Sequence, residues 1–477
     1  MIRTPELGLD LRPLLRLLTI ACLFVLAAYV GQSPSWELLR LFVLLGGAVS
    51  LAVLLRYPQL RLPTLVVASF IIPLSISTGT NTDLNVTVLL LPVFIGLWLL
   101  ELLQRREIRL PSSRPVLPLM AFALVAVLSF GMGQLPWYLT ESAPLLAQLG
   151  GLAVFLLSAG AFLLVAHHVR DLQSLEWLTW LFLAFGALFL AGRLVPGLRH
   201  VVVDILFQEG STSSLFWVWV AALAFGQALF NRRLPPRWRL ACGGLVLVLF
   251  YSAWFEGRTW ASGWLPPLVA VGTILWLGVP RLRPLMLLSG AAIATFYSRQ
   301  VVAEVMVGNE YSWITRLEAW RIVLEIVKVS PLLGLGPANY HWYTPLFPIL
   351  GWSVQFNSHN QYVDILAQTG VLGLAGFLWF AWEVFWLGWR LRDRVATGFA
   401  QAYVYGALGG LAGTLAAGAL ADWVLPFVYN VGLKGMRSSI FGWIFLGGLV
   451  ALELMVTNGS GAQQNGEDPL PPRSFGR

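Results

Sequence analysis

The sequence has 477 residues, of which 57% are hydrophobic and 11% charged, against roughly 45–50% and 25% in an ordinary soluble domain. A soluble protein is therefore excluded, and the mean hydropathy of +0.74 indicates that lipid surrounds most of the chain. Two cysteines, Cys22 and Cys242, both in apolar runs, exclude a disulfide framework and a thiolate metal site. The net charge of +8 raises the question of an acidic partner, nucleic acid included.

A membrane-spanning helix needs about 20 apolar residues, and the sequence contains fourteen candidates. In chain order they are 14–31, 38–55, 62–77, 85–103, 115–133, 144–166, 174–193, 213–230, 239–255, 262–279, 284–298, 361–388, 397–421 and 438–456. The first follows Arg12 and Arg16, is too long for a signal peptide and lacks a cleavage site, so we expect it to remain as an anchor.

The connections between these spans alternate in arginine content, as the positive-inside rule requires. With the N-terminus inside, 21 of the 31 Lys and Arg residues fall in inner segments and 10 in outer ones. The basic charge is therefore mainly a topology signal, and nucleic acid is excluded as a partner. We expect an all-α polytopic membrane protein with about 12–14 transmembrane helices and one large outer loop.

The longest connection, about 60 outer residues, divides the chain, and ordered loops of this length are usually functional. We expect an N-terminal transmembrane bundle at 1–298, the large outer loop at 299–360 and C-terminal transmembrane helices at 361–456. The Gly/Pro/Gln-rich segment 457–477 predicts a disordered cytoplasmic tail. Shorter outer loops are expected near 195–214, 255–262 and 422–437.

Ionisable side chains are rare within the spans: Glu383 is the clearest, with Asp364 and Glu176 near span ends. Ion-coupled carriers usually hold a charged cluster near the membrane midplane. The absence of such a cluster in the sequence argues against a transporter. A flippase with a polar, uncharged cavity stays open as an interpretation. The unusual residues lie instead at the outer membrane boundary.

Residues 311–329 in the large loop predict a helix that ends before Ser330-Pro331. Its apolar stripe is expected at Trp313, Leu317, Trp320, Leu324 and Val327.

Two arginines on this helix differ in their surroundings. Arg321 has Glu318 and Glu325 at helical spacing, which predicts a salt-bridged, solvated face. Arg316 has no acidic residue at those spacings, so it either reaches lipid headgroups or awaits an anionic ligand.

Three further features of the outer side carry possible chemistry. The glycines of Leu-Leu-Gly-Leu-Gly-Pro at 332–337 favour a loop turn over a phosphate cradle. His359 lies where the loop re-enters the membrane, and an imidazole is suited to general-base work at neutral pH. Arg258, in a short outer turn, either pairs with Glu256 or meets a lipid phosphate, for which arginine is suited.

Metal and nucleotide sites find no support in the sequence. The aspartates never form D-x-D, no H-x-x-x-H or paired-cysteine spacing occurs, and there is no Walker-type loop. We therefore expect a transfer reaction on the outer face that uses arginines for an anionic leaving group, with neither a metal nor a cofactor.

Four segments together resemble the signature of the O-antigen ligase/polymerase family. They are Arg316-Leu-Glu-Ala-Trp320, Ser330-Pro-Leu-Leu-Gly-Leu-Gly336, Ser358-His-Asn-Gln-Tyr362 and Gln368-Thr-Gly-Val-Leu-Gly373. Gly257-Arg258-Thr-Trp260 resembles the S-R-G-like turn of the family, with Gly257 in place of Ser and Thr259 in place of Gly.

The resemblance implies a GT-C-like membrane glycosyltransferase of the bacterial inner (cytoplasmic) membrane. Such an enzyme takes glycan from an undecaprenyl-diphosphate carrier on the periplasmic face. By the resemblance, Arg258 and Arg316 would hold the diphosphate and His359 would be the catalytic base, with Trp320, Asn360 and Tyr362 in support.

The acceptor hydroxyl and the class of protein stay open at this point. A ligase passes glycan to a lipid A core, a polymerase to another carrier-linked repeat, and a protein O-glycosyltransferase to Ser or Thr. We expect inversion at the anomeric carbon. The alternatives are a flippase or exporter of lipid-linked glycan, and a purely structural scaffold.

Overall fold

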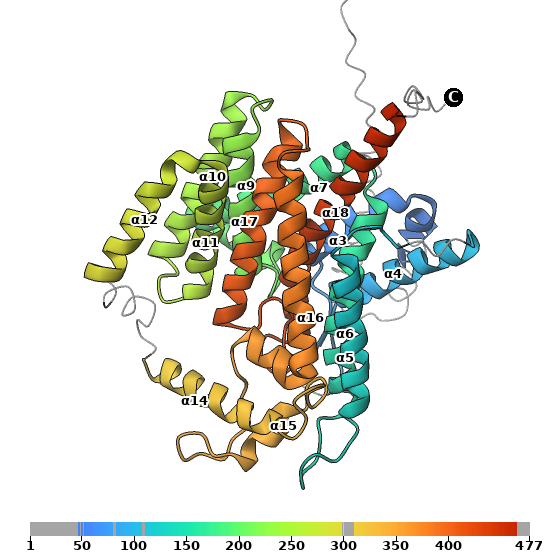
Figure 1. Cartoon of the computed structure of the whole chain (residues 1–477), viewed down its shortest axis with the longest axis vertical. Coiled ribbons are helices and arrows are strands. Elements are labelled where there is room, and N and C mark those ends of the chain that lie inside the picture. Colours follow the sequence, from blue (N-terminus) through green and yellow to red (C-terminus); the bar gives the residue numbers. More distant parts are fainter. Residues whose placement is uncertain are drawn as a thin grey trace, which may run out of the picture.

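The computed structural model of the chain (Figure 1) describes residues 46–464, except 48, 51, 80–82, 107–109, 298 and 300–309. The predicted span 14–31, most of 38–55 and the end of the predicted tail lie outside these residues. The first half of the helical elements comprises α3 (Arg61–Ile71), α4 (Val86–Gln104), α5 (Val116–Met132), α6 (Leu145–His168), α7 (Leu172–Leu194), α8 (Pro196–Arg199) and the π-helix η2 (His200–Leu206). The second half comprises α9 (Ser214–Phe230), α10 (Pro236–Phe255), α11 (Ala261–Gly278), α12 (Arg283–Ala292), α14 (Glu310–Val327), α15 (Tyr340–Tyr343), α16 (Gln361–Leu391), α17 (Phe399–Leu420) and α18 (Met436–Gln464).

Long helices pack side by side around a continuous apolar core (Figure 1). The closest neighbours are α17 with α9 and α11, α18 with α6, and α16 with α5. Eight helices of the described residues are long and apolar enough to cross a membrane, and α5 and α9 are shorter apolar helices. The prediction of an all-α polytopic membrane protein is confirmed.

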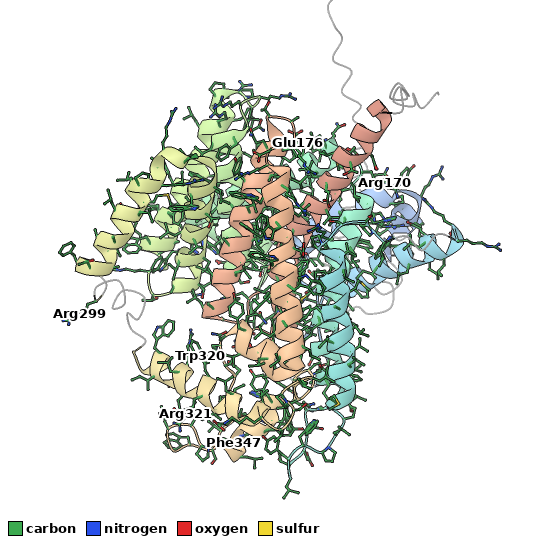
Figure 2. All side chains as sticks on the ribbon, in the orientation of Figure 1. Arg170, Glu176, Arg299, Trp320, Arg321 and Phe347 are labelled. Atoms are coloured by element: carbon green, nitrogen blue, oxygen red, sulfur yellow. The ribbon has the colours of Figure 1, made fainter. Side chains whose placement is uncertain are left out.

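Arginines gather at one end of the bundle, where Arg170, Arg233, Arg283 and Arg392 lie at or beside the ends of α6, α10, α12 and α16. We call this end the arginine-rich face. Figure 2 labels Arg170 and Glu176 there, and labels Trp320, Arg321 and Phe347 at the opposite end, which we call the α14 face. These four arginines share one end of the bundle, as the alternation predicts for cations of the inner segments.

Two of the predicted spans are wrong in length. The span expected at 62–77 ends as α3 at Ile71, and residues 75–77 pair with 83–85 in a small antiparallel hairpin, β1 (Ser75–Ser77) with β2 (Asp83–Asn85). The span expected at 284–298 is the ten-residue α12 followed by a π-helical turn. Hydropathy measures composition and not where a helix stops, and both helices fall short of the about 20 residues that a span needs.

The early end of α3 leaves carbonyl groups that Arg437 of α18 satisfies. Its guanidinium donates to the carbonyl oxygens of Ser69 (3.3 Å), Ile72 (2.9 Å) and Leu74 (3.2 Å). Unpaired carbonyls are costly away from water, so this buried arginine allows α3 to stop short. At its other end α18 continues to Gln464, which places residues 457–464, expected in the tail, in the helix.

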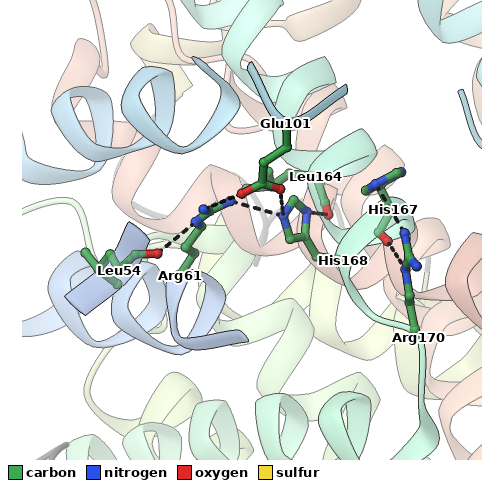
Figure 3. Close-up of polar contacts among 7 residues, drawn as sticks. All are labelled: Leu54, Arg61, Glu101, Leu164, His167, His168 and Arg170. Atoms are coloured by element: carbon green, nitrogen blue, oxygen red, sulfur yellow. Dashed lines mark hydrogen bonds and ion pairs between the residues drawn. The ribbon is translucent and has the colours of Figure 1, made fainter. Parts of the chain in front are cut away.

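A second buried arginine joins three helices near the arginine-rich face (Figure 3). Arg61 of α3 is 1% exposed, pairs with Glu101 of α4 at 2.6 Å and lies 3.3 Å from Nε2 of His168 of α6. It also donates to the carbonyl of Leu54 at 3.2 Å. Arg61 is one of the 21 Lys and Arg residues that the sequence analysis counts in inner segments, and the structure makes it a structural cation inside the fold.

The helix α14 crosses the end of the bundle beneath α16 and α17 (Figure 1). The buried face of α14 packs against α16 and against the loop that follows α14. This face consists of Ala319, Ile322, Val323, Ile326 and Val327. The predicted stripe is confirmed at Val327 and wrong at Leu317 and Leu324, which are 55% and 44% exposed. The stripe was placed on the largest apolar residues, whereas the face with smaller and β-branched side chains is the one that packs.

The helix α16 is broken at Gly370, which has φ 67° and ψ −171°. The segment Pro331–Gly336 fills the break: Leu335 and Gly336 donate to the carbonyls of 367 and 368, and 371 and 372 donate to those of 331 and 332. A Cβ on Gly370 would lie 2.2 Å from the Leu332 oxygen, and one on Gly334 would lie 2.6 Å from the Gly370 nitrogen. These glycines therefore serve a backbone interlock, and the turn interpretation is favoured over a phosphate cradle.

Candidate functional site at the α14 face

Arg316 is a residue of α14, and its side chain reaches the C-terminal end of α17. Its Nη1 donates to the carbonyl oxygen of Leu420 at 3.1 Å, and its guanidinium lies 5.3 Å from the centre of the Trp313 ring. Its Nε is buried and has no hydrogen-bond partner among the described residues. A buried N–H without an acceptor is costly, so an anionic group that reached this donor would relieve the cost.

His359 sits on the short segment that leads into α16. Its φ of 49° places it in the left-handed region. This backbone conformation costs energy for a residue other than glycine, and such residues cluster at functional sites. The carbonyl before it, that of Ser358, accepts from Trp320 Nε1 at 2.7 Å. Because Trp320 and Arg316 are on the same helix, α14 fixes the arginine and the histidine relative to each other.

Asn360 and Tyr362 hold the start of α16. Asn360 is the N-cap, and its Oδ1 accepts from the amides of Tyr362 (3.0 Å) and Val363 (3.3 Å). The Tyr362 hydroxyl donates to the Leu415 carbonyl of α17 at 2.7 Å. The hydrogen bonds of both side chains are therefore to the protein backbone.

A buried hydrogen-bonded cluster next to His359 consists of Ser358, Tyr340 and Asp364. The Asp364 Oδ1 accepts from the Ser358 hydroxyl (2.7 Å) and from the Tyr340 hydroxyl (2.5 Å). Burial and the Asp364 carboxylate raise the pKa of Tyr340 well above its ordinary value, so this hydroxyl stays protonated and keeps donating. The positive φ of His359 is held by this network.

A second carboxylate reaches His359 through an amide. Asn430 Nδ2 lies 3.2 Å from His359 Nδ1 and also donates to Oδ1 of Asp422, whose Oδ2 accepts from the Phe427 amide at 2.7 Å. Asp422 and Asn430 come from the loop between α17 and α18, far from the histidine in sequence. The three side chains form a chain that runs from a buried acid to the imidazole.

The hydrogen bonds among Asp422, Asn430 and His359 can decide which ring nitrogen of His359 carries the proton. With Asp422 ionised, the Asn430 NH₂ group donates to the carboxylate and to Nδ1, so the neutral ring carries its proton on Nε2. With Asp422 protonated, its O–H can donate to an amide oxygen turned toward it. That oxygen then accepts from Nδ1–H, and the Nε2 lone pair is free. If the Asn430 amide turns in this way, the protonation of Asp422 would select the tautomer of His359.

Burial shifts the pKa values in this group. Burial, with a smaller contribution from Arg316, lowers the pKa of His359 to about 4, so the ring is neutral at neutral pH. Burial raises the pKa of Asp422 to about 6 against the hydrogen bonds from Phe427 and Asn430. Burial also lowers the pKa of Arg316, which the Asp422 carboxylate opposes. Arg316 therefore acts electrostatically on His359, and Asp422 acts electrostatically on Arg316.

Arg258 lies at the turn between α10 and α11 and is exposed. Its guanidinium is 5.2 Å from the Trp254 ring centre, and its carbonyl accepts from Trp264 Nε1 at 3.2 Å. Glu256, which the sequence offered as its partner, pairs with Arg193 at 2.6 Å. Trp260 of the same turn contacts Trp423, 6.2 Å between ring centres, so the turn lies beside the loop that carries Asp422.

Sequence reasoning missed Asp422, Asn430 and Arg193. Asp422 stands alone among apolar residues in Ala-Leu-Ala-Asp-Trp-Val-Leu, and an isolated acid in such a segment is a usable signal. Asn430 and Arg193 carry no comparable signal. Among the residues that the structure describes, no three His, Cys, Asp or Glu side chains come together as a metal site.

The fold and the site define a multi-pass membrane protein with a polar group at one end of a helical bundle. A family model described as O-antigen ligase matches residues 200–378, a stretch that includes Arg258, Arg316, Trp320 and His359. The chain therefore carries an O-antigen ligase domain, and the resemblance to the O-antigen ligase/polymerase family is confirmed. The domain makes the protein a glycan-processing membrane enzyme that acts on lipid-linked glycan and an acceptor. No curated protein matches the chain.

Proposed function

We propose that the protein is a glycosyltransferase that moves an undecaprenyl-diphosphate-linked glycan to an acceptor hydroxyl. The observation that carries this proposal is the unpartnered, buried Nε–H of Arg316 within electrostatic reach of His359. A lipid diphosphate is a leaving group on which negative charge grows, and fixed guanidinium donors stabilise such charge without reorganisation. Arg316 would hold the diphosphate, with Arg258 contributing from the neighbouring turn.

In the proposed reaction His359 is the general base. The acceptor oxygen forms a bond to the anomeric carbon, its proton passes to Nε2 of His359, and the bond from that carbon to the diphosphate oxygen breaks. Attack opposite the leaving group inverts the anomeric configuration. The products are the glycosylated acceptor and free lipid diphosphate, and the arginines supply the positive charge that a metal would otherwise provide.

The base must carry its proton on Nδ1 before it can accept one at Nε2. This tautomer requires the Asn430 amide oxygen to face the ring, and a protonated Asp422 supports that arrangement. Asp422 and Asn430 are therefore positioning residues in the proposed mechanism, and Trp320 positions the backbone of His359 through Ser358.

We further propose that the arginine-rich face is cytoplasmic and that the α14 face is periplasmic in a bacterial inner membrane. The excess of arginine at one end supports this orientation. A lipid A core, another carrier-linked repeat and a protein hydroxyl all remain acceptors of the required chemistry.

Transfer in proteoliposomes tests the proposal against a flippase. Purified protein would receive undecaprenyl-diphosphate glycan and an acceptor in the presence of EDTA, with products identified by mass spectrometry and anomeric configuration by NMR. We expect a covalent glycan–acceptor product of inverted configuration and free lipid diphosphate. Movement of the glycan across the bilayer with no covalent product would show the flippase instead.

A further inference from the structure

An apolar groove runs along the outside of the bundle between α7 and α10. It has a volume of about 900 Å³. Its walls include Leu183, Ala187 and Leu190 of α7 and Ala241, Leu245 and Val248 of α10. The alanines leave the space that larger side chains would fill.

The groove runs along α7 from Trp177 to Leu194 and along a shorter stretch of α10. Its lining there runs from Trp238 to Val248, which is about 15 Å at 1.5 Å per residue. Half of a hydrocarbon core of roughly 30 Å has the same depth. Trp177 and Trp238 stand at one end of the groove and are 67% and 53% exposed, as is usual for tryptophan at the membrane–water boundary. The groove therefore opens at the boundary on the arginine-rich face.

A polar cavity of about 200 Å³ adjoins this end and shares Leu234 with the groove. Glu176, Asn231 and Arg233 line it, so one anion, one cation and one amide are close together. Figure 2 labels Glu176 at this end of the molecule. The arrangement of apolar groove and charged cavity is that of a site for an amphiphile.

Asn231, one of the residues that line the cavity, has an amide oxygen without a hydrogen-bond donor in the part of the chain that the structure describes. The residue is 3% exposed, and its Nδ2 already donates to Gln227 Oε1 at 2.7 Å. Its Oδ1 is buried and has no donor among the described residues. A buried amide oxygen needs a donor, and a ligand group that carries N–H or O–H and reaches Asn231 would supply one.

We propose that this site binds an aminophospholipid with a primary ammonium group. The ammonium donates to Asn231 Oδ1 and Glu176, the phosphodiester pairs with the Arg233 guanidinium, and an acyl chain fills the groove. An ammonium has three donors and an arginine matches a phosphate. The proposal does not depend on the transferase function.

The same chemistry separates this ligand from other lipids. A choline headgroup has no N–H and leaves the Asn231 oxygen without a donor. A phosphatidylglycerol headgroup carries no positive charge to place beside Glu176. We therefore expect a preference for phosphatidylethanolamine over both.

Native mass spectrometry of the purified full-length protein tests the preference. The protein would be incubated with equal amounts of phosphatidylethanolamine, phosphatidylcholine and phosphatidylglycerol. We expect retention of one phosphatidylethanolamine, weakened about tenfold or more in Arg233→Gln, since a charge-assisted hydrogen bond contributes roughly 1.5–3 kcal/mol. Arg237→Gln is the matched control, because Arg237 is exposed at the start of α10 and does not line the cavity; it should bind as the wild type does.

Two further variants distinguish the headgroup from the groove. Glu176→Gln should reduce the preference for phosphatidylethanolamine over phosphatidylglycerol, and Ala187→Phe should weaken retention of every phospholipid. Equal retention of the three lipids by the wild type, or unchanged binding in both Arg233→Gln and Glu176→Gln, would overturn the proposal.

Cys242 gives a readout on the unaltered protein, so that misfolding of a variant cannot decide the outcome. It lines the groove, and peptide mapping reports its alkylation separately from that of Cys22. Added phosphatidylethanolamine should slow alkylation by a membrane-permeant maleimide more than phosphatidylcholine does. Equal protection by the two lipids would contradict the headgroup preference.

Discussion

Asp422 combines full burial with a hydrogen bond to the amide that contacts the proposed base. Because its pKa is raised to about 6, its protonated form dominates below that pH and its ionised form above it. The proposed base form of His359 requires the protonated acid and a neutral ring, whose pKa is about 4. Wild-type transfer should therefore be greatest between about pH 4 and 6 and decline as the pH rises further.

Asp422→Asn separates this proposal from one in which His359 only donates a hydrogen bond. The NH₂ group of the substituted amide can donate to the Asn430 oxygen at every pH, which fixes the proton on Nδ1 of His359. We expect the variant to keep its transfer activity and to lose the decline above about pH 6, measured as initial rate from pH 4 to 9. A folded Asp422→Asn protein that is inactive throughout would contradict the base role.

Arg316 and Arg321 offer a matched pair on one helix. Arg316→Lys keeps a donor for the Leu420 carbonyl but loses the planar guanidinium that matches phosphate. We expect kcat/KM for the donor to fall about 10²-fold, the scale of one lost oxyanion donor. Arg321 is 76% exposed at its side chain and pairs with Glu318, so Arg321→Lys should be within about twofold of wild type because exposed pairs contribute little. Equal changes in kcat/KM for Arg316→Lys and Arg321→Lys would contradict a specific role of Arg316 in binding the diphosphate.

The backbone interlock between Pro331–Gly336 and the break in α16 holds the helix that follows His359. Gly370→Ala places a Cβ against the Leu332 oxygen, 2.2 Å away, at a positive φ. We expect it to destabilise the protein by at least about 1–3 kcal/mol from backbone strain alone, seen as a lower apparent Tm in detergent. Gly96→Ala in α4 is the control, since its Cβ would meet nothing within 4 Å and alanine favours a helix. Equal Tm values for the two variants would show that the interlock is not required.

The buried Arg61–Glu101 pair joins α3 to α4 near the arginine-rich face and is distant in sequence from the α14 face. Arg61→Met leaves Glu101, whose side chain is 29% exposed, without its arginine, so the variant should be destabilised by less than the roughly 3–5 kcal/mol that an unpaired, fully buried charge costs. Arg61→Met combined with Glu101→Met should recover most of the loss, because no unpaired charge remains. Thermal unfolding of the purified variants in detergent measures both; a double variant no more stable than Arg61→Met would contradict this role.

Sequence patterns predicted those features of the whole molecule that depend on local composition. Helices occur at every predicted span within the described residues, because apolar composition decides burial in lipid. Arg316 stood out because its own helix gives it no acid, and the structure supplies a carbonyl at Leu420 and the nearby charge of Asp422 instead.

The contacts that complete the site could not be foreseen. Asn430 meets His359 across 71 positions, and no local pattern records such a pairing. The break at Gly370 lies within a long apolar run whose hydropathy continues through it. The length of α3 depends on Arg437, a residue more than 360 positions away. Tertiary contacts decide each of these features.

The most direct test of the proposed function is the single-turnover rate of glycan transfer by His359→Ala, measured with purified undecaprenyl-diphosphate glycan. Binding of the donor should be measured on the same preparation. We expect the rate to fall about 10²- to 10⁴-fold, the contribution of a general base, with donor affinity nearly unchanged. A folded His359→Ala protein that transfers glycan at the wild-type rate would contradict the proposed role of His359 at this site.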